Sequence, residues 1–263
     1  MQTPIDTAHA AMVARPEDDA ARLAFFERLA DAELVLMLTA EPEGEQIAPE
    51  LFAVQGGRFV LAFDAEERLA AFAGRPVPYA ALPGRVIAAL AAGQGIGLGL
   101  NLGAGSETLL GPEELGWLAE VLEHGPAQAE GRIRAYHPPD APDRLVQALA
   151  AKLARAAGLA RAAWLAGTTD AGGGRGHLLA FEGARPEAQP ALARAVHEAL
   201  VFSGIEAGAL DVTFLPEADP EPSPAAARIA RVALRLDIPE PPRPEPATPA
   251  APGTDPDRPP RLR

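Results

Sequence analysis

The 263-residue sequence contains no cysteine, which excludes disulfide bonds, thiolate metal sites and a cysteine nucleophile. Aromatic residues make up only 5% of the chain, so its cores are expected to consist mainly of small apolar side chains. Lys152 is the single lysine, and the excess of arginine, alanine and proline indicates a GC-rich coding bias.

Long apolar runs are also missing, and none approaches the length of about 18 residues that a membrane-spanning helix needs. Residues 1–14 have neither the basic start nor the apolar stretch of a signal peptide. The formal net charge of −13 opposes binding to a nucleic-acid backbone or an anionic membrane. Together these absences predict a cytoplasmic, bacterial-type protein with neither nucleic acid nor membrane as a partner.

What the sequence does contain is 48% apolar residues in a chain long enough for two modest cores. We expect an α+β fold of two small mixed domains, because helix-like and strand-like patterns alternate along the chain. The expected parts are N-terminal helices at 1–31, a first domain at 32–125, a linker at 126–131, a second domain at 132–236 and a disordered proline-rich tail at 237–263.

The first domain is expected to contain a hairpin. Residues 51–54 and 59–63 (FVLAF) are short apolar runs on either side of a Gly-Gly turn, which is typical of paired strands. Asp64 follows the second run and is expected to cap a helix, with Glu67 three residues later completing a capping-box pattern.

A glycine-rich strand is predicted at 95–100, where glycine alternates with isoleucine or leucine. Its glycine face has room for backbone but not for side chains, so another element must lie close against it. We expect that neighbour to be the helix at 83–92 or the helix at 112–122, with a bound ligand as the alternative. The glycine spacing does not fit a dinucleotide-binding turn, because the glycines lie within the strand.

These features carry a family resemblance. Residues 34–122 resemble the N-terminal domain of the SseB family, the enhanced-serine-sensitivity protein family, and residues 132–236 are more loosely similar to its C-terminal domain. The matching features are Gly57-Arg58 before the strand, Glu67-Arg68-Leu69, Leu82-Pro83-Gly84-Arg85 and the glycine-rich strand that ends at Asn101. The resemblance implies no established catalytic residues, so none is assigned.

The second domain is predicted to follow the order βαββαβ, that of the ferredoxin-like arrangement. A further helix is expected at 224–234. The six expected elements are a strand at 132–136, a helix at 142–157, strands at 159–166 and 177–181, a helix at 186–202 and a strand at 210–215.

Two places in the second domain are candidates for chemistry. His137, Asp140 and Asp143 form the closest cluster of titratable residues, although Asp140 is more simply the N-cap of the following helix. The loop at 168–176 (TTDAGGGRG) offers backbone N–H groups and Arg175 to an anion, with a flexible hairpin loop as the simpler interpretation.

No histidine pair has metal-ligand spacing and no serine has a hydrolase context, so no catalytic, cofactor-binding or metal-binding residue is assigned. We therefore expect a non-catalytic interaction or regulatory protein whose partner is a protein or a small metabolite. The alternative is an enzyme or metabolite-binding protein with a site that assembles only in the fold, near His137, Asp140 and Asp143.

Overall fold

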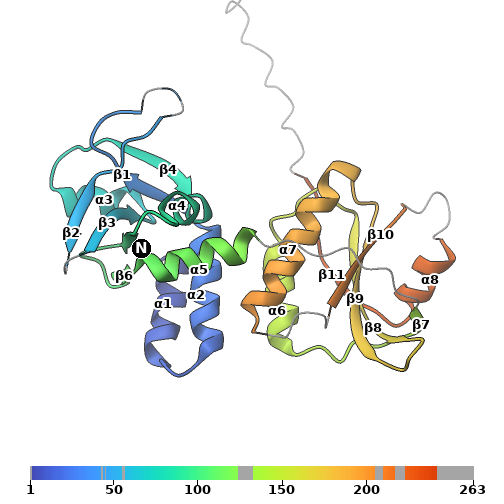
Figure 1. Ribbon diagram of the computed structural model, residues 1–263. Helices are drawn as coiled ribbons and strands as arrows, with labels where there is room; N and C mark the ends of the chain where they lie inside the picture. Colours follow the sequence, from blue (N-terminus) through green and yellow to red (C-terminus); the bar gives the residue numbers. More distant parts are fainter. Residues whose placement is uncertain are drawn as a thin grey trace, which may run out of the picture.

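The computed structural model describes residues 2–42, 44, 46–54, 57–123, 133–204, 210–216 and 223–241, and shows a mixed α+β protein with two mixed sheets (Figure 1). We call residues 2–123 the first half and residues 133–241 the second half. The predicted α+β class is confirmed. The predicted linker at 126–131 lies outside the described residues, and the division into domains stays a prediction.

The first half is built on a sheet with strand order β4-β1-β3-β5-β6, in which β2 pairs with β3 beyond the end of β1. Only β3 and β5 run parallel; the other pairs are antiparallel. The strands are β1 (Glu33–Met37), β2 (Leu51–Val54), β3 (Gly57–Phe63), β4 (Tyr79–Pro83), β5 (Ile96–Leu100) and β6 (Thr108–Leu110). The predicted hairpin is thus confirmed as β2 and β3.

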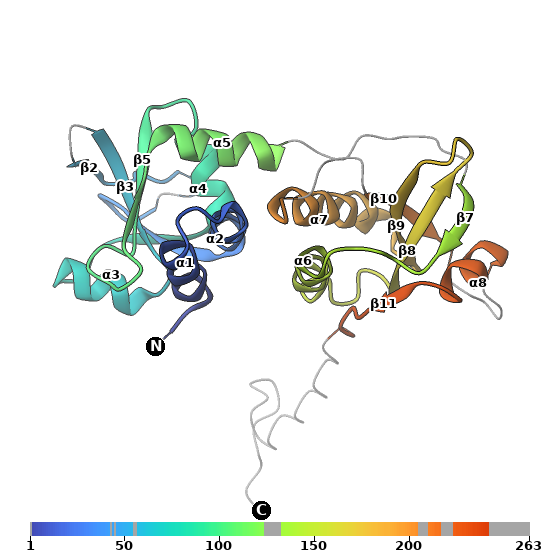
Figure 2. The ribbon, with the colours of Figure 1, turned by 90° about the horizontal axis from the view of Figure 1, so that it is seen from below.

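Helices cover the two sides of this sheet unequally (Figure 2). Leu34, Leu36 and Val60 point to the side covered by α1 (Pro4–Ala14), α2 (Asp19–Asp31), α4 (Gly84–Ala91) and α5 (Pro112–Glu123). Val35 and Leu61, which alternate with them, point to the side covered by the eight residues of α3 (Glu66–Ala73) alone. Because successive side chains of a strand point to opposite faces, the apolar residues of this sheet are divided between a large core on one side and a small core on the other.

The second half has the strand order β10-β9-β8-β11, with β7 pairing with the other end of β8. One side packs against α6 (Asp143–Leu153) and α7 (Gln189–Phe202), and the other against α8 (Pro224–Ala230). The remaining elements are β7 (Ile133–His137), β8 (Ala162–Asp170), β9 (Arg175–Glu182), β10 (Leu210–Leu215), β11 (Leu234–Leu236) and the 3₁₀ helix η1 (Pro186–Ala188).

The ferredoxin-like arrangement predicted for this half is wrong. The element order βαββαβ is present, but a split βαβ unit needs another strand between the two strands that a helix connects. Here α6 joins β7 and β8, which are antiparallel neighbours, and α7 joins β9 and β10, which are parallel neighbours. The chain-order pattern was correct, and the pairing of the strands differs.

The proline-rich tail begins later than the predicted residue 237. Residues 234–236 form β11 on the edge of β8, where a helix running to residue 234 was expected. The N–H of Gly158 donates to the carbonyl of Pro239 (3.1 Å), and Ile238 packs against the second core. The predicted residues 242–263 of the tail lie outside the described residues. Among the described helices, none is long and apolar enough to cross a membrane.

Candidate functional site

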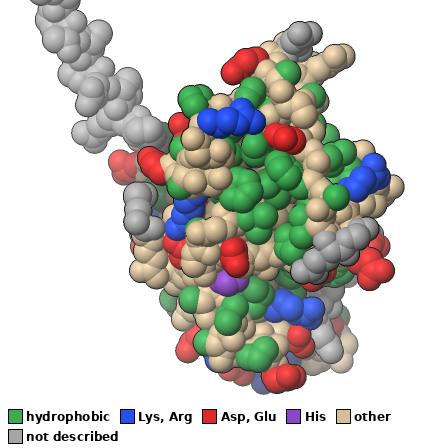
Figure 3. All heavy atoms as spheres, turned by 90° about the vertical axis from the view of Figure 1, so that its left-hand side faces the viewer, with side chains coloured by type: hydrophobic (Ala, Val, Ile, Leu, Met, Phe, Trp, Pro, Cys, Tyr) green, Lys and Arg blue, Asp and Glu red, His purple; other side chains and the backbone are tan. Residues whose placement is uncertain are grey.

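The side of the first sheet that α3 covers leaves apolar side chains in contact with solvent. We call it the open face; it is formed by Phe52, Phe72, Val77, Tyr79 and Leu102. Figure 3 views the side of the molecule that carries β2 and α3, and hydrophobic side chains gather in the middle of that surface. Phe72 is 41% exposed although its ring packs 5.4 Å from the ring of Phe63, so it extends the small core to the surface.

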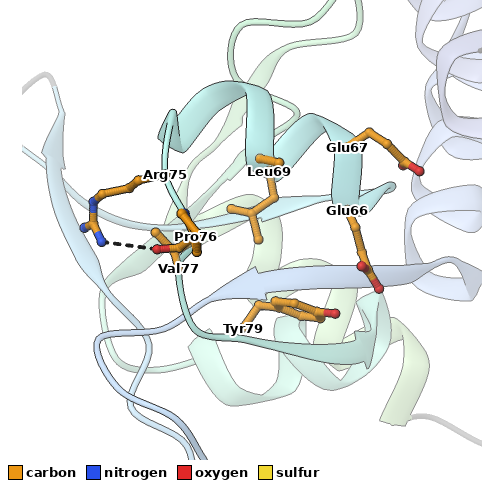
Figure 4. Close-up of a pocket in the computed structure, with 8 residues that line it drawn as sticks. Glu66, Glu67, Leu69, Arg75, Pro76, Val77 and Tyr79 are labelled. Atoms are coloured by element: carbon orange, nitrogen blue, oxygen red, sulfur yellow. Dashed lines mark hydrogen bonds between the residues drawn. The ribbon is translucent and has the colours of Figure 1, made fainter.

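A cleft of about 580 Å³ adjoins the open face, between α3 and the segment that leads into β4. Leu69 points from α3 to its floor, and the ring of Tyr79 forms the opposite wall (Figure 4). Glu66 lies above the hydroxyl end of that ring, and Arg75 lies at the other end of the cleft. The lining residues are Glu66, Glu67, Leu69, Ala70, Arg75, Pro76, Val77 and Tyr79.

Charge is distributed unevenly along this cleft. The hydrogen bond and negative charge of Glu66, together with the charge of Glu41, raise the pKa of the Tyr79 hydroxyl. Glu67 adds a second exposed carboxylate from α3. At the far end the guanidinium of Arg75 donates to the carbonyl of Pro76 (3.5 Å). The cleft therefore combines an apolar floor with one acidic end, and this is chemistry that suits a basic, partly apolar ligand.

The glycine-rich strand does not contribute a binding site. A Cβ atom at Gly97 would overlap the ring of Phe59 and lie 2.6 Å from the Leu110 carbonyl oxygen, and one at Gly99 would lie 2.6 Å from Leu61 Cδ2. The parallel register places Phe59 beside Gly97 and Leu61 beside Gly99, so side chains of β3 fill the space above the glycines. The prediction of close packing is confirmed, but the predicted helix neighbour is wrong and no space for a ligand remains there.

The two halves meet through a group of charged residues, which we call the bridging ion cluster. It consists of Glu27 and Asp31 on α2, Arg85 on α4, Lys152 on α6, Arg155 just after α6, and Glu198 on α7. Lys152 Nζ lies 2.8 Å from Asp31 Oδ2 and 2.9 Å from Glu198 Oε2, and its side chain is 6% exposed. Arg85 contacts the same two carboxylates, at 2.5 Å and 2.9 Å. Residues from four helices therefore share one buried network.

Burial tends to raise the pKa of every carboxyl group in this cluster, and only the two carboxyls that pair closely with cations have a lowered pKa. Desolvation raises the pKa of Glu27, whose Oε1 lies 3.6 Å from Lys152 and accepts no hydrogen bond. Desolvation acts on Asp31 and Glu198 too, but Lys152 and Arg85 hold the pKa of both carboxyls below the ordinary value. The cluster thus contains two stabilised carboxylates and one that is poorly compensated.

Aromatic rings pack beside the cluster and complete the contact between the halves. Phe202 of α7 belongs to the large core of the first half, and its ring lies 6.5 Å from that of Trp117 on α5. Trp117 in turn packs edge-on against Phe26 (5.1 Å), and Lys152 lies 5.9 Å from the Phe202 ring centre. Trp117 is therefore a packing residue, at a contact between the halves that the sequence did not reveal.

A second polar network fixes α1 to α3 and to the segment between β5 and β6. Arg68 donates to both carboxylate oxygens of Asp6 (2.8 and 2.6 Å) and to Asp64 (2.9 Å), and Ser106 donates to Asp6 (2.5 Å). The hydrogen bonds from Arg68, and further ones from Ser106 and the backbone of Thr3, hold the pKa of Asp6 well below its usual range. Asp64 belongs to this network and does not cap α3, so the predicted capping box is wrong.

The fold does not assemble the predicted cluster of His137, Asp140 and Asp143. The imidazole of His137 lies over Gly167 of β8, and its Nδ1 lies 3.0 Å from the Pro138 carbonyl oxygen. Asp140 and Asp143 are exposed, and neither makes a hydrogen bond or ion pair with His137. Asp140 is not the N-cap of α6 either. Within the described ranges, no group of three or more His, Asp or Glu side chains is placed to hold a metal ion.

The loop predicted at 168–176 is shorter than expected, and its donors are already used. β8 extends to Asp170 and β9 begins at Arg175, so only a tight turn remains between them. Asp170 Oδ1 accepts hydrogen bonds from the N–H groups of Gly172 and Gly174, both at 2.8 Å. The chain's own carboxylate thus occupies the backbone donors that an anion would need, so the anion-binding interpretation is not supported.

A comparison with known protein families finds a match in the first half. Residues 8–117 match the family model of the SseB protein N-terminal domain, which confirms the resemblance drawn from the sequence for this part of the chain. No curated protein and no solved structure matches the chain significantly.

Proposed function

We propose that this protein, which carries a match to the SseB N-terminal domain over residues 8–117, is a non-catalytic interaction or regulatory protein that binds a polypeptide on the open face of its first sheet. The observation that carries the proposal is the open face itself, an apolar surface next to a cleft of about 580 Å³. Contiguous apolar surface rimmed by polar residues is typical of protein-interaction sites.

The alternative sites in the described part of the chain are less suited to a partner than the open face. The bridging ion cluster occupies the surface between the halves, so that surface is already in use within the molecule. The candidate catalytic cluster at His137 is dispersed, and the glycine face of β5 is filled by Phe59 and Leu61. Among the described residues, the open face is an apolar surface that lies next to a cleft, and only α3 packs on that side of the sheet. A cytoplasmic location, expected from the sequence, stays a prediction.

A small metabolite is the second candidate, and one observation favours it. A cleft of about 420 Å³ lies where the parallel strands β9 and β10 end, next to the start of η1. Ligands of α/β proteins commonly bind at the carboxyl ends of parallel strands. Arg185, Gln189 and Phe214 line this cleft and supply charge, hydrogen bonding and apolar contact.

A photo-crosslinking residue placed at Phe72 tests the main proposal. We expect it to capture a specific polypeptide from a cell lysate, and the same residue placed at Val13 to capture none. Val13 is the matched control because it is 61% exposed and lies on α1, which packs on the other side of the sheet.

The substitution Phe52→Ser should then abolish capture at Phe72, because both side chains belong to the open face. The melting temperature of each variant checks that the chain stays folded. Equal capture at both positions, or capture that Phe52→Ser leaves unchanged, would contradict a partner site on the open face.

A further inference from the structure

We infer that the cleft beside α3 and the free edge of β4 together bind an extended, basic polypeptide segment, which adds to the first sheet as a further strand. The inference rests on the proposed function and specifies the chemistry and conformation of the partner. Three features of the structure carry it: the free donors and acceptors of β4, the position of the cleft beside them, and the charge of its rim.

The first feature is the free edge. Within the described chain β4 pairs with β1 alone, in the register Leu36↔Ala80 and Leu34↔Leu82. The Leu38 N–H donates to the Pro78 carbonyl (3.0 Å), so Leu38 and Pro78 are a hydrogen-bonded pair. Hydrogen-bonded and non-hydrogen-bonded residue pairs alternate along the two strands from that point. Ala80 and Leu82 therefore bond to β1, while the N–H and C=O groups of Tyr79 and Ala81 point away from it. Such a row of unpaired groups is what an added strand bonds to.

The second feature is the position of the cleft. Tyr79 and Ala81 lie opposite Met37 and Val35, whose side chains belong to the small core under α3. The side chains of Tyr79 and Ala81 are thus on the α3 side of the sheet. Alternate side chains of a strand added beside β4 would point to that same side, toward the cleft between α3 and β4. Ala81 is small and exposed and leaves room for them.

The third feature is the charge of the rim. Glu66 and Glu67 are exposed on α3, and the charge of Glu41 also acts on Tyr79. The protein as a whole carries a formal net charge of −13. A lysine or arginine of the partner near Glu66 and an apolar side chain on Leu69 and Val77 satisfy both parts of the cleft. An acidic segment would be repelled at the end of the cleft that carries Glu66 and Glu67.

The prolines around β4 limit how long the added strand is. Pro78 precedes the strand, and Pro83 ends it without an N–H group to donate. A short edge strand flanked by proline resists pairing with long, flat strands of other proteins. The site therefore suits a short segment whose affinity comes from its side chains as well as from the ladder, and the acidic rim selects among such segments.

The test uses the full chain and a labelled peptide of about seven residues, acetylated and amidated at its ends, in which every second residue is arginine or valine in turn and the residues between them are serine, so that one face of the strand carries both types. We expect the peptide with glutamate in place of arginine to bind about tenfold more weakly or worse. Methylation of the peptide nitrogens that face β4 should abolish binding measured by fluorescence anisotropy. Hydrogen exchange at the amides of Tyr79 and Ala81 should slow when the basic peptide binds.

Three variants separate the role of the acidic rim from the role of backbone hydrogen bonding to β4. Glu66→Gln with Glu67→Gln should weaken the basic peptide about fivefold, the effect of two exposed ion pairs. Glu17→Gln with Glu113→Gln makes the same change of net charge at exposed positions elsewhere, in the turn before α2 and on α5, and should leave affinity unchanged. Ala81→Pro removes one outward donor without touching the bonds to β1, and should weaken binding while the melting temperature stays near that of the unmodified chain.

Several outcomes would overturn the inference. Equal binding of the acidic and basic peptides would remove the role of the rim, and binding that survives both peptide methylation and Ala81→Pro would exclude strand addition. Dimerisation of the full chain in sedimentation, lost in Ala81→Pro, would make a second copy the occupant. If Phe72 still captures a partner in the Glu66→Gln, Glu67→Gln chain at undiminished yield, the proposed function stands and this inference fails.

Discussion

Replacing Lys152 by methionine tests the bridging ion cluster at its centre. Methionine keeps most of the apolar length of the lysine side chain, so the change removes a charge and leaves only a small cavity. Lys152 Nζ lies within 3.6 Å of three carboxylates, and its side chain is 6% exposed. Without it, two arginines remain for three buried acidic groups.

The size of the effect follows from how the carboxylates are paired. Asp31 keeps Arg85 and Arg155, and Glu198 keeps Arg85, but Glu27 loses the cation that partly offsets its burial. Removing one partner from a buried ion network costs about 3–5 kcal/mol. Because two of the three carboxylates keep an arginine, we expect a loss near the lower limit, about 3 kcal/mol in the free energy of unfolding.

Urea unfolding followed by tryptophan fluorescence measures this loss. The chain has two tryptophans, and Trp117 lies at the contact between the halves, so Trp164→Phe gives a background in which the signal reports that contact. Arg22→Met is the matched control, because Arg22 pairs with Asp19 at the surface, where both side chains are more than half exposed. The control should change stability by less than about 1 kcal/mol. A loss of the same small size in Lys152→Met would refute the reasoning.

For three further substitutions the structure predicts whether the stability of the protein rises or falls. Burial raises the pKa of Glu27 in the folded protein, so ionisation of its carboxyl lowers stability at neutral pH. Glu27→Gln should therefore raise the urea midpoint at pH 7, and the gain should vanish below pH 4.5, the ordinary pKa of the group. A lowered midpoint at pH 7 would contradict this expectation. Gly97→Val should cost about 3 kcal/mol or more, because its side chain meets Phe59 and the backbone of Leu110; an unchanged melting temperature would contradict the packing. Arg68→Ala should cost about 1.5–3 kcal/mol and speed amide exchange in α1, and unchanged exchange there would contradict its role as an anchor.

Local patterns predicted the individual elements well. The alternation at 95–100 and the apolar run at 59–63 each determine the local backbone through neighbouring residues, and both strands are confirmed. The glycine face was also predicted to be closely packed. Its neighbour was missed because the register that places Phe59 beside Gly97 joins strands 38 residues apart, and no local pattern encodes that pairing.

Strand order in the second half was not predictable in the same way. An order of elements along the chain is compatible with several sheets, and the choice depends on which strand edges meet. β11 is only three residues long, Leu234–Leu236. Three residues are too few to show the alternation of apolar and polar side chains that distinguishes a strand from a continuation of the preceding helix. Its pairing with β8 closes the edge beside β7 and moves the start of the tail past Pro239.

The bridging ion cluster shows what signal a sequence does contain about contacts between distant elements. Glu198 is separated from Arg85 by 113 positions and from Lys152 by 46, so spacing cannot pair them. Yet Glu198 lies within the apolar stripe of α7, and Glu27 lies within that of α2, flanked by buried residues. A charge in a buried stripe has to find an opposite charge, and Lys152 lies in the stripe of α6. Acidic residues in two stripes and a basic residue in a third therefore indicate that the three helices meet, and this criterion would have predicted the contact between the halves.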